Sequence, residues 1–205
     1  KMFKMLVRVI TILSLGKSLR TVFLAVLLIF SSQSFATAGK LKFSESNELV
    51  FFQGPIILDE IDDILSQLTD KKPKLMLLDS IGGNIYGALQ FAKYVRKNQM
   101  DTWISEGSAC ASACALVFLA GIERTCEGKL LVHQFLPAIE YENEKIRTDV
   151  AWISIQKVIG ETITLLNSLD TPRFVFERIF TSPNLYEFTE AELLKICTVV
   201  RLDKI

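Results

Sequence analysis

The stretch KLMLLDSIGGNIYGALQFAKYVRKNQ, residues 74–99, joins a short apolar run to an amphipathic segment through a pair of glycines. Residues 74–80 are mostly apolar and lead into turn residues, which predicts a buried strand. Apolar side chains recur at helical spacing over residues 85–99, which predicts a helix with one buried face. A buried strand that leads into a helix is the building unit of parallel α/β sheets.

The same alternation of strands and helices extends over most of the chain. Apolar runs predict further strands at residues 48–56, 101–106, 129–135 and 197–202. Helical spacing predicts further helices at residues 58–70, 112–121, 149–169 and 189–196, and one that has Pro172 in its first turn and Asp170 or Thr171 as its cap. We therefore expect an α/β fold in which helices cover both faces of a mostly parallel central sheet.

Charge is unevenly distributed along the 205 residues, although the formal net charge of the whole chain is zero. Residues 1–38 contain five of the 23 basic residues and none of the acidic ones, which leaves residues 39–205 with 18 basic and 23 acidic side chains. A mildly acidic domain without a stripe of lysine and arginine is not typical of a nucleic-acid binder. The composition therefore argues against a nucleic-acid partner.

The first 38 residues have the pattern of a secretory signal peptide. A basic flank precedes an apolar run, and small residues then end in Ala36-Thr37-Ala38. The apolar run, residues 21–30, is shorter than the roughly 20 residues that a membrane-spanning helix needs. We expect cleavage after Ala38 and a single periplasmic or otherwise exported domain over residues 39–205. An uncleaved N-terminal anchor is the alternative, because residues 5–15 add a second apolar stretch.

The four cysteines are Cys110, Cys114, Cys126 and Cys197. Their spacing does not indicate a zinc site, because no second ligand pair follows the first two and the chain has one histidine. In an exported protein cysteines are free to form disulfides. We expect one or two disulfides, with small buried thiols as the alternative. The sequence does not predict the pairing.

Three features at predicted strand ends are candidates for a catalytic site: Gly82-Gly83, Ser112 and His133. Ser112 begins a predicted helix, where it is either an N-cap or a nucleophile whose oxyanion the N–H of Ala113 would bind. The glycine pair is either a tight turn or a second source of N–H groups for that oxyanion. His133, the sole histidine, is either a core residue or the base that would activate Ser112.

The order and spacing of these features resemble the Clp protease proteolytic subunit and its relatives in the crotonase superfamily. The resemblance rests on VFFQGPI (50–56), DSIGGNIYGALQFAKYVR (79–96), GSACASACALVFLAGIER (107–124) and LLVHQF (130–135). It implies a Clp/crotonase-like ββα-superhelix with Ser112 as nucleophile and His133 as base. It also implies an oxyanion hole formed by the N–H groups of Ala113 and of Gly82 or Gly83.

The resemblance further implies a serine peptidase that acts on a peptide or protein, needs no metal or other cofactor, and forms homo-oligomers. Residues 141–148 match the start of the protruding region through which subunits of the family often meet. An exported form is not expected to have an ATPase partner, because ATP is scarce outside the cytosol. A non-catalytic relative that binds itself or the cell envelope is the main alternative. A CoA-dependent enzyme of the crotonase branch is a second alternative, which export disfavours.

The sequence departs from the family pattern in three places, one of which is a slightly shorter interval between the serine and the histidine. Ile81 stands where the Clp subunit has a proline before its glycine pair. The family's catalytic aspartate would fall near Thr181 or Ser182, where this chain has no carboxylate. The third catalytic residue therefore stays open between Asp149, Asp170, Glu177 and none.

Overall fold

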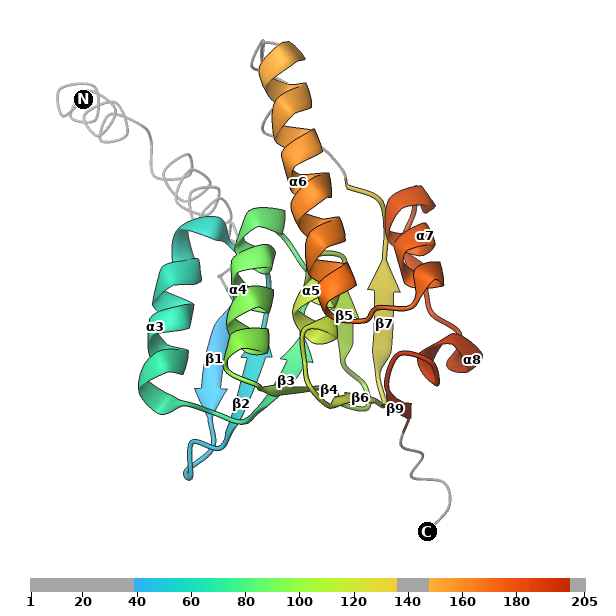
Figure 1. Cartoon of the computed structure of the whole chain (residues 1–205). Helices are drawn as coiled ribbons and strands as arrows, with labels where there is room; N and C mark the ends of the chain where they lie inside the picture. Colours follow the sequence, from blue (N-terminus) through green and yellow to red (C-terminus); the bar gives the residue numbers. More distant parts are fainter. Residues whose placement is uncertain (1–38, 136–147, 200–205) are drawn as a thin grey trace, which may run out of the picture. The chain divides into compact units, whose positions relative to one another are not determined.

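The computed structural model describes residues 39–135 and 148–199, which belong to one compact unit spanning residues 38–205 (Figure 1). The strands are β1 (Lys40–Phe43), β2 (Leu49–Gln53), β3 (Leu75–Asp79), β4 (Asp101–Ile104), β5 (Ala109–Ala111), β6 (Arg124–Cys126), β7 (Lys129–Val132), β8 (Tyr186–Glu187) and β9 (Thr198–Val199). The helices are the 3-10 turn η1 (Leu58–Glu60), α3 (Ile61–Lys71), α4 (Ile85–Lys97), α5 (Cys114–Leu119), α6 (Thr148–Ser168), α7 (Arg173–Thr181) and α8 (Glu190–Leu193). The predicted signal peptide and most of the predicted protruding region lie outside the described residues.

Two sheets form the framework of the domain. The larger sheet has six strands in the order β1-β2-β3-β4-β6-β9, and only β1 runs antiparallel to its neighbour. The smaller sheet has the order β5-β7-β8, in which β5 and β7 are parallel and β8 is antiparallel. The predicted α/β fold with a mostly parallel sheet is therefore confirmed.

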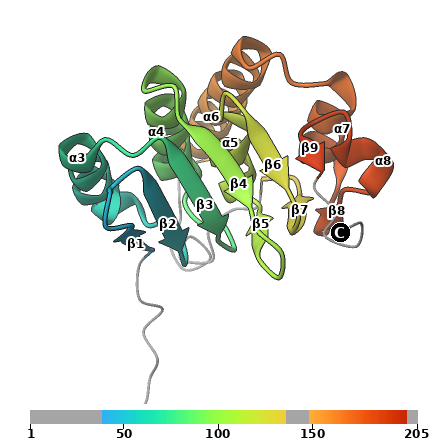
Figure 2. The same ribbon diagram turned by 90° about the horizontal axis from the view of Figure 1, so that it is seen from below.

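Helices α3, α4 and α5 lie on one face of the larger sheet (Figure 2). Residues of β2, β3 and β4 alternate between buried and partly exposed positions, as expected for a sheet with one covered face. The prediction that helices cover both faces is therefore wrong. The cause is the strand order: β2, β3, β4 and β6 are added in one direction, so right-handed crossovers place every connecting helix on the same face.

The smaller sheet arises where two strands of the larger sheet are interrupted. Strand β4 continues into β5 after a turn in which Gly107 has φ +78°, and β6 continues into β7 after Gly128. A Cβ on Gly128 would lie 2.3 Å from the carbonyl oxygen of Ser108. Only glycine at residue 128 therefore allows the turn after β6 to pack against the turn after β4. The carboxyl ends of β5 and β7 therefore project together beyond the larger sheet.

Element boundaries differ from the prediction mainly at short strands and helix ends. The sequence patterns missed β1, β5, β6 and β8, which have only two to four residues each. Helix α4 begins as predicted, and Asn84 caps it by accepting from the N–H groups of Tyr86 and Gly87. The predicted cap of α7 is wrong, because Pro172 occupies the cap position and no side chain caps the helix.

All four cysteines form disulfides, which pair Cys110 with Cys114 and Cys126 with Cys197. The expectation of one or two disulfides is confirmed, and the alternative of buried free thiols is wrong. In the described part of the chain, no helix is both long enough and apolar enough to cross a membrane.

Candidate active site

Ser112 lies in a turn between β5 and α5 and has a left-handed backbone with φ +56°. Helix α5 begins at Cys114 and has Ala113 at its cap position, so the interpretation of Ser112 as a helix N-cap is wrong. The Ser112 backbone is fixed from both sides, because its N–H donates to Leu131 over 2.9 Å and its carbonyl accepts from Ala115 over 3.0 Å. The Ser112 side chain is partly exposed, and its hydroxyl has no hydrogen bond within the described chain.

The backbone of Gly82 packs directly against the Ser112 turn. Gly82 has φ +87°, and a Cβ at this position would lie 2.5 Å from the carbonyl oxygen of Ala111 and 2.8 Å from both Ala113 N and Ser112 Cβ. Any side chain would collide with backbone, which cannot move aside. The structure therefore brings Gly82 together with Ser112 and Ala113, which follow it by about 30 residues in sequence.

Two backbone N–H groups beside Ser112 are free of acceptors in the described residues, namely those of Gly83 and Ala113. The N–H of Gly82 is engaged, because it donates to the buried hydroxyl of Ser80 over 3.1 Å. The carbonyl of Gly82 accepts from Ile56, and in a trans peptide the N–H of Gly83 then points away from Ile56.

The free N–H of Ala113 has a comparable origin. The carbonyl of Ser112 accepts from the N–H of Ala115 in the first turn of α5, so the N–H across the same peptide plane points away from that helix. Helix N-terminal N–H groups lack intrahelical partners and attract negative charge. Of the two glycines, Gly83 is therefore the one that has an N–H left to donate alongside Ala113.

His133 follows the last residue of β7, at the same end of the smaller sheet as Ser112. Its Nδ1 lies 2.5 Å from the carbonyl oxygen of Gln134. A carbonyl oxygen can only accept, so in the neutral ring Nδ1 carries the hydrogen and Nε2 keeps a lone pair. We assign this tautomer from the partner atom. It is the tautomer that a base acting through Nε2 requires.

The end of helix α7 lies beside the His133 segment. The N–H of Gln134 donates to the carbonyl of Ser182 over 2.8 Å. The rings of Phe135 and Phe180 pack edge to face with 5.5 Å between their centroids. The segment around Ser182 is thus close to the histidine, and residue 182 itself carries no carboxylate.

None of the carboxylates that the structure describes hydrogen-bonds to His133. Glu177 forms an ion pair with Arg173, and Asp170 interacts electrostatically with Arg124. The side chain of Asp149 lies outside the described part of the chain. The structure therefore does not bring Asp170 or Glu177 to the imidazole. Nδ1 of His133 instead contacts the carbonyl oxygen of Gln134.

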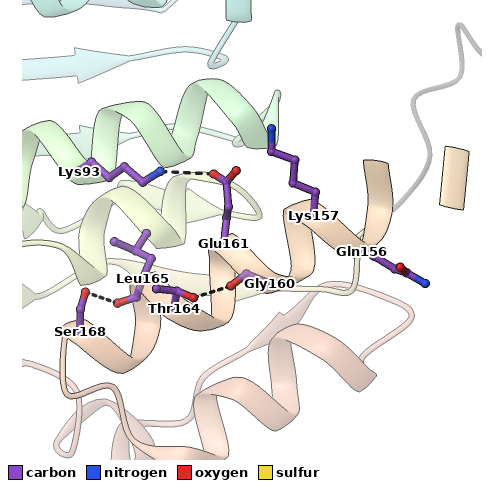
Figure 3. A pocket seen from close by; sticks show the side chains of 8 residues that line it. All are labelled: Lys93, Gln156, Lys157, Gly160, Glu161, Thr164, Leu165 and Ser168. Carbon is purple, nitrogen blue, oxygen red and sulfur yellow. Dashed lines mark hydrogen bonds and ion pairs between the residues drawn. The ribbon is translucent and has the colours of Figure 1, made fainter. Parts of the chain in front are cut away.

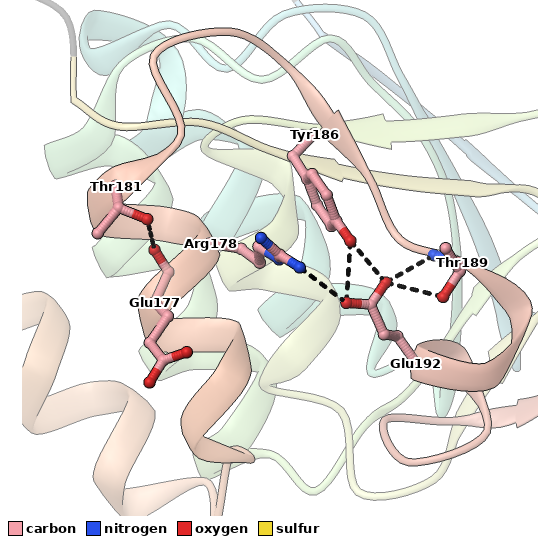
Figure 4. A network of polar contacts seen from close by, with 6 residues as sticks. All are labelled: Glu177, Arg178, Thr181, Tyr186, Thr189 and Glu192. Atoms are coloured by element: carbon pink, nitrogen blue, oxygen red, sulfur yellow. Dashed lines mark hydrogen bonds and ion pairs between the residues drawn. The ribbon is translucent and has the colours of Figure 1, made fainter.

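A polar network fixes the region that follows α7 (Figure 4). The carboxylate of Glu192 accepts from the hydroxyl of Tyr186 and from the N–H and hydroxyl of Thr189, each over 2.9 Å. Arg178 lies 3.6 Å from the same carboxylate and stacks 4.1 Å above the ring of Tyr186. Since Tyr186 pairs with Val132 in the smaller sheet, the network supports strand β7, which ends immediately before His133.

The network shifts the pKa of two of its members. The hydrogen bond to Glu192 is the main cause that raises the pKa of Tyr186. Burial acts to raise the pKa of Glu192, but the hydrogen bonds from Thr189 and Tyr186 and the charge of Arg178 outweigh it and lower that pKa. None of the predicted site residues belongs to this network, although the pattern Thr189-x-x-Glu192 is a capping-box signature that locates two of its members in the sequence.

A shallow pocket of about 390 Å³ lies between α4 and α6 (Figure 3). Lys93, Glu161 and Leu165 are among the residues that line it, and Lys93 pairs with Glu161 over 3.3 Å. None of the predicted site residues lines this pocket. In the part of the chain that the structure describes, no three side chains of His, Cys, Asp or Glu gather as a metal site would require.

Comparisons with protein-family models and with curated proteins find no match for this sequence. Among solved structures, the chain is similar to a peptidase from Plasmodium falciparum, with a TM-score of 0.60 and 13% sequence identity. The similarity covers 76% of this chain and 97% of the peptidase chain. The chain therefore has an α/β fold that a peptidase also has. At 13% identity the likeness extends to the fold alone.

Proposed function

We propose that this protein is a serine hydrolase that cleaves peptides, with Ser112 as nucleophile and His133 as general base. The observation that carries the proposal is the left-handed turn at Ser112, which packs against Gly82. Within the described residues the hydroxyl of Ser112 has no hydrogen bond, and the N–H groups of Gly83 and Ala113 have no acceptor. A left-handed backbone at a non-glycine residue is costly, and such residues concentrate at functional sites. The peptidase with the similar fold supports a peptide substrate.

The proposed reaction follows the acyl-enzyme route. Nε2 of His133 takes the hydroxyl proton of Ser112 while Oγ forms a bond to the scissile carbonyl carbon. The carbonyl oxygen becomes an oxyanion, which the N–H groups of Gly83 and Ala113 stabilise. The oxyanion then reforms the carbonyl while the C–N bond breaks, and His133 gives its proton to the amine that leaves. A water molecule attacks the resulting acyl-enzyme, gives its proton to His133 and breaks the ester bond, and His133 returns the proton to Oγ of Ser112. No step draws on a metal or another cofactor.

The finer features of the proposal come from the resemblance noted in the sequence. They are a Clp/crotonase-like superhelix, a homo-oligomeric assembly and a periplasmic or otherwise exported location without an ATPase partner. The pairing of all four cysteines supports an oxidising compartment. Two parallel strands that end immediately before Ser112 and His133 support the Clp-like arrangement of nucleophile and base.

The experiment that tests the proposal is labelling of the folded protein with a fluorophosphonate, which reacts with activated serines. We expect labelling of the wild type and none of Ser112→Ala. Ser108→Ala is the matched control, because Ser108 lies four residues earlier and its hydroxyl is already bonded to Ser105 over 3.0 Å. His133→Gln should slow the labelling about 100-fold or more, since general bases contribute that much. Absence of Ser112-dependent labelling in folded wild type would overturn the proposal.

A non-catalytic relative of the same fold is the second candidate. It is favoured by one observation, the lack of a described carboxylate on His133, because loss of the orienting carboxylate costs a triad enzyme about 10⁴ in rate. The two candidates differ in a measurable way. A hydrolase labels through Ser112 and releases product from peptides, whereas a non-catalytic relative does neither and leaves Ser112→Ala indistinguishable from the wild type.

A further inference from the structure

The Cys110–Cys114 disulfide encloses Ser112 in a five-residue ring. The Cα atoms of the two cysteines are 5.3 Å apart, whereas four residue steps of extended chain would span about 13 Å. Cys110 is the middle residue of β5 and Cys114 is the first residue of α5. The bridge therefore fixes the chain reversal at whose centre Ser112 stands.

The conformation inside this ring is one that serine does not adopt readily. Ser112 has φ +56°, and an L-residue in the left-handed region is disfavoured by roughly tenfold in population. Hydrogen bonds from Ser112 to Leu131 and from Ala115 to Ser112 hold the turn from outside the ring. The disulfide is the one covalent constraint on the turn, and both of its sulfur-bearing residues are buried to 1% exposure or less.

The geometry points to a positioning role for this disulfide: it keeps Ser112 in its left-handed conformation and keeps the N–H of Ala113 pointing out of the turn. This inference rests on the proposed hydrolase function and names Cys110 and Cys114 as positioning residues of that site. If the ring opens, the backbone relaxes to an unstrained φ, and the hydroxyl and the N–H no longer face the same point. Binding of a ligand to the surrounding surface would be unaffected.

The second disulfide provides a matched control. Cys126 and Cys197 are 71 residues apart and join β6 to the short edge strand β9, so their bridge closes a far longer loop. Loop-closure entropy makes this bridge the more important one for global stability. Neither Cys126 nor Cys197 is among the residues that hold the Ser112 turn. Loss of the Cys126–Cys197 bridge should therefore cost more stability, and loss of the Cys110–Cys114 bridge should cost more reactivity at Ser112.

The test compares Cys110→Ala/Cys114→Ala with Cys126→Ala/Cys197→Ala, each at a temperature well below its unfolding midpoint. Opening the first bridge should lower the maximal rate of fluorophosphonate labelling at Ser112 by about tenfold or more. The reagent concentration that gives half of the maximal rate should stay unchanged. Opening the second bridge should lower the unfolding midpoint more than opening the first does, and it should leave the labelling rate near that of the wild type. Equal labelling rates in the two folded variants would overturn the inference while leaving the hydrolase proposal intact.

A second measurement separates the inference from the hydrolase proposal. Backbone ¹³C chemical shifts report the φ of Ser112 whether or not the protein is active. We expect the left-handed signature in the wild type and its loss in Cys110→Ala/Cys114→Ala. If Ser112 keeps its left-handed shifts without the bridge, the inference is wrong. If the double alanine variant does not fold, Cys110→Val/Cys114→Ala refills the buried volume and the same shifts decide the outcome.

Discussion

The backbone N–H of Ser112 donates to the carbonyl of Leu131 over 2.9 Å, which ties the serine turn to the strand that ends immediately before His133. This bond continues the parallel register of β5 and β7, in which Ala111 pairs with Leu131. Because the two strands share a direction, their carboxyl ends meet at one edge of the smaller sheet. The proposed nucleophile and base thus occupy neighbouring strand ends of one rigid element.

Gly82→Ala should destabilise the protein and abolish fluorophosphonate labelling. The new Cβ would meet the backbone of Ala111 and Ala113 at 2.5 and 2.8 Å, so the Ser112 turn must move. We expect a loss of at least about 2 kcal/mol in the free energy of unfolding, measured by urea denaturation. Gly107→Ala is the control: Gly107 also has positive φ, but its Cβ meets nothing within 4 Å. Gly107→Ala should lose only about 1 kcal/mol in the free energy of unfolding and should still be labelled by the fluorophosphonate.

Ser80→Ala should destabilise the protein by about 1–3 kcal/mol, because it leaves the buried N–H of Gly82 without an acceptor. The Ser80 side chain is nearly inaccessible, at 3% exposure, so water cannot take its place readily. Ser66→Ala, an exposed position on α3, should change stability by less than about 0.5 kcal/mol. Equal midpoints for the two variants in chemical denaturation would contradict the assignment of this bond.

The neutral ring of His133 should carry its hydrogen on Nδ1. The reason is the carbonyl of Gln134, which lies 2.5 Å from Nδ1 and can only accept. Since His133 is the sole histidine, a ¹⁵N–¹H correlation spectrum of the imidazole gives one unambiguous set of signals. A hydrogen on Nε2 would show that the ring is not oriented to act as a base toward Ser112.

Glu192→Gln should remove part of the acid sensitivity of folding. The pKa of Glu192 is lower in the folded state than the roughly 4.3 of an unfolded chain, so the unfolded state binds more protons in this range. The stabilisation by its carboxylate is therefore complete above about pH 4.3 and is lost as the pH falls through the folded pKa.

The variant should lose roughly 1–2 kcal/mol at neutral pH and show a flatter stability curve below pH ~4.3. Thermal midpoints measured from about pH 2 to about pH 7, the range in which carboxylates titrate, test this prediction. Glu106→Gln is the control, because the exposed Glu106 carboxylate has no hydrogen bond in the described chain. A curve for Glu192→Gln that parallels the wild type would count against the network of Figure 4.

Cys126→Ala/Cys197→Ala should lower the free energy of unfolding by about 4 kcal/mol, the chain-entropy value for a loop of this length. The same relation gives about 2 kcal/mol for the short ring of Cys110 and Cys114. Urea denaturation of the two double variants measures the difference directly. A larger loss from the short ring would show that loop entropy is not what the long bridge supplies.

The sequence by itself determined the α/β class and the long elements. Apolar periodicity located α4 and α6 to within a few residues, because a helix of 13 or 21 residues repeats its pattern several times. Strands of two to four residues carry no such repeat, so β1, β5, β6 and β8 escaped notice. Strand order is a long-range property, and it decided that the helices cover one face.

Residue types at strand ends were also enough to single out Gly82, Gly83, Ser112, Ala113 and His133 as candidates. Only the tertiary structure decided how they are presented: Ser112 is left-handed rather than a helix cap, and Ser80 engages the N–H of Gly82. It also decided that a disulfide encloses the turn and that a carbonyl, not a carboxylate, contacts His133. The conformation of the Ser112 turn depends on backbone groups distant in sequence, namely the carbonyl of Leu131 and the backbone of Gly82. No local pattern of side chains encodes where such groups meet.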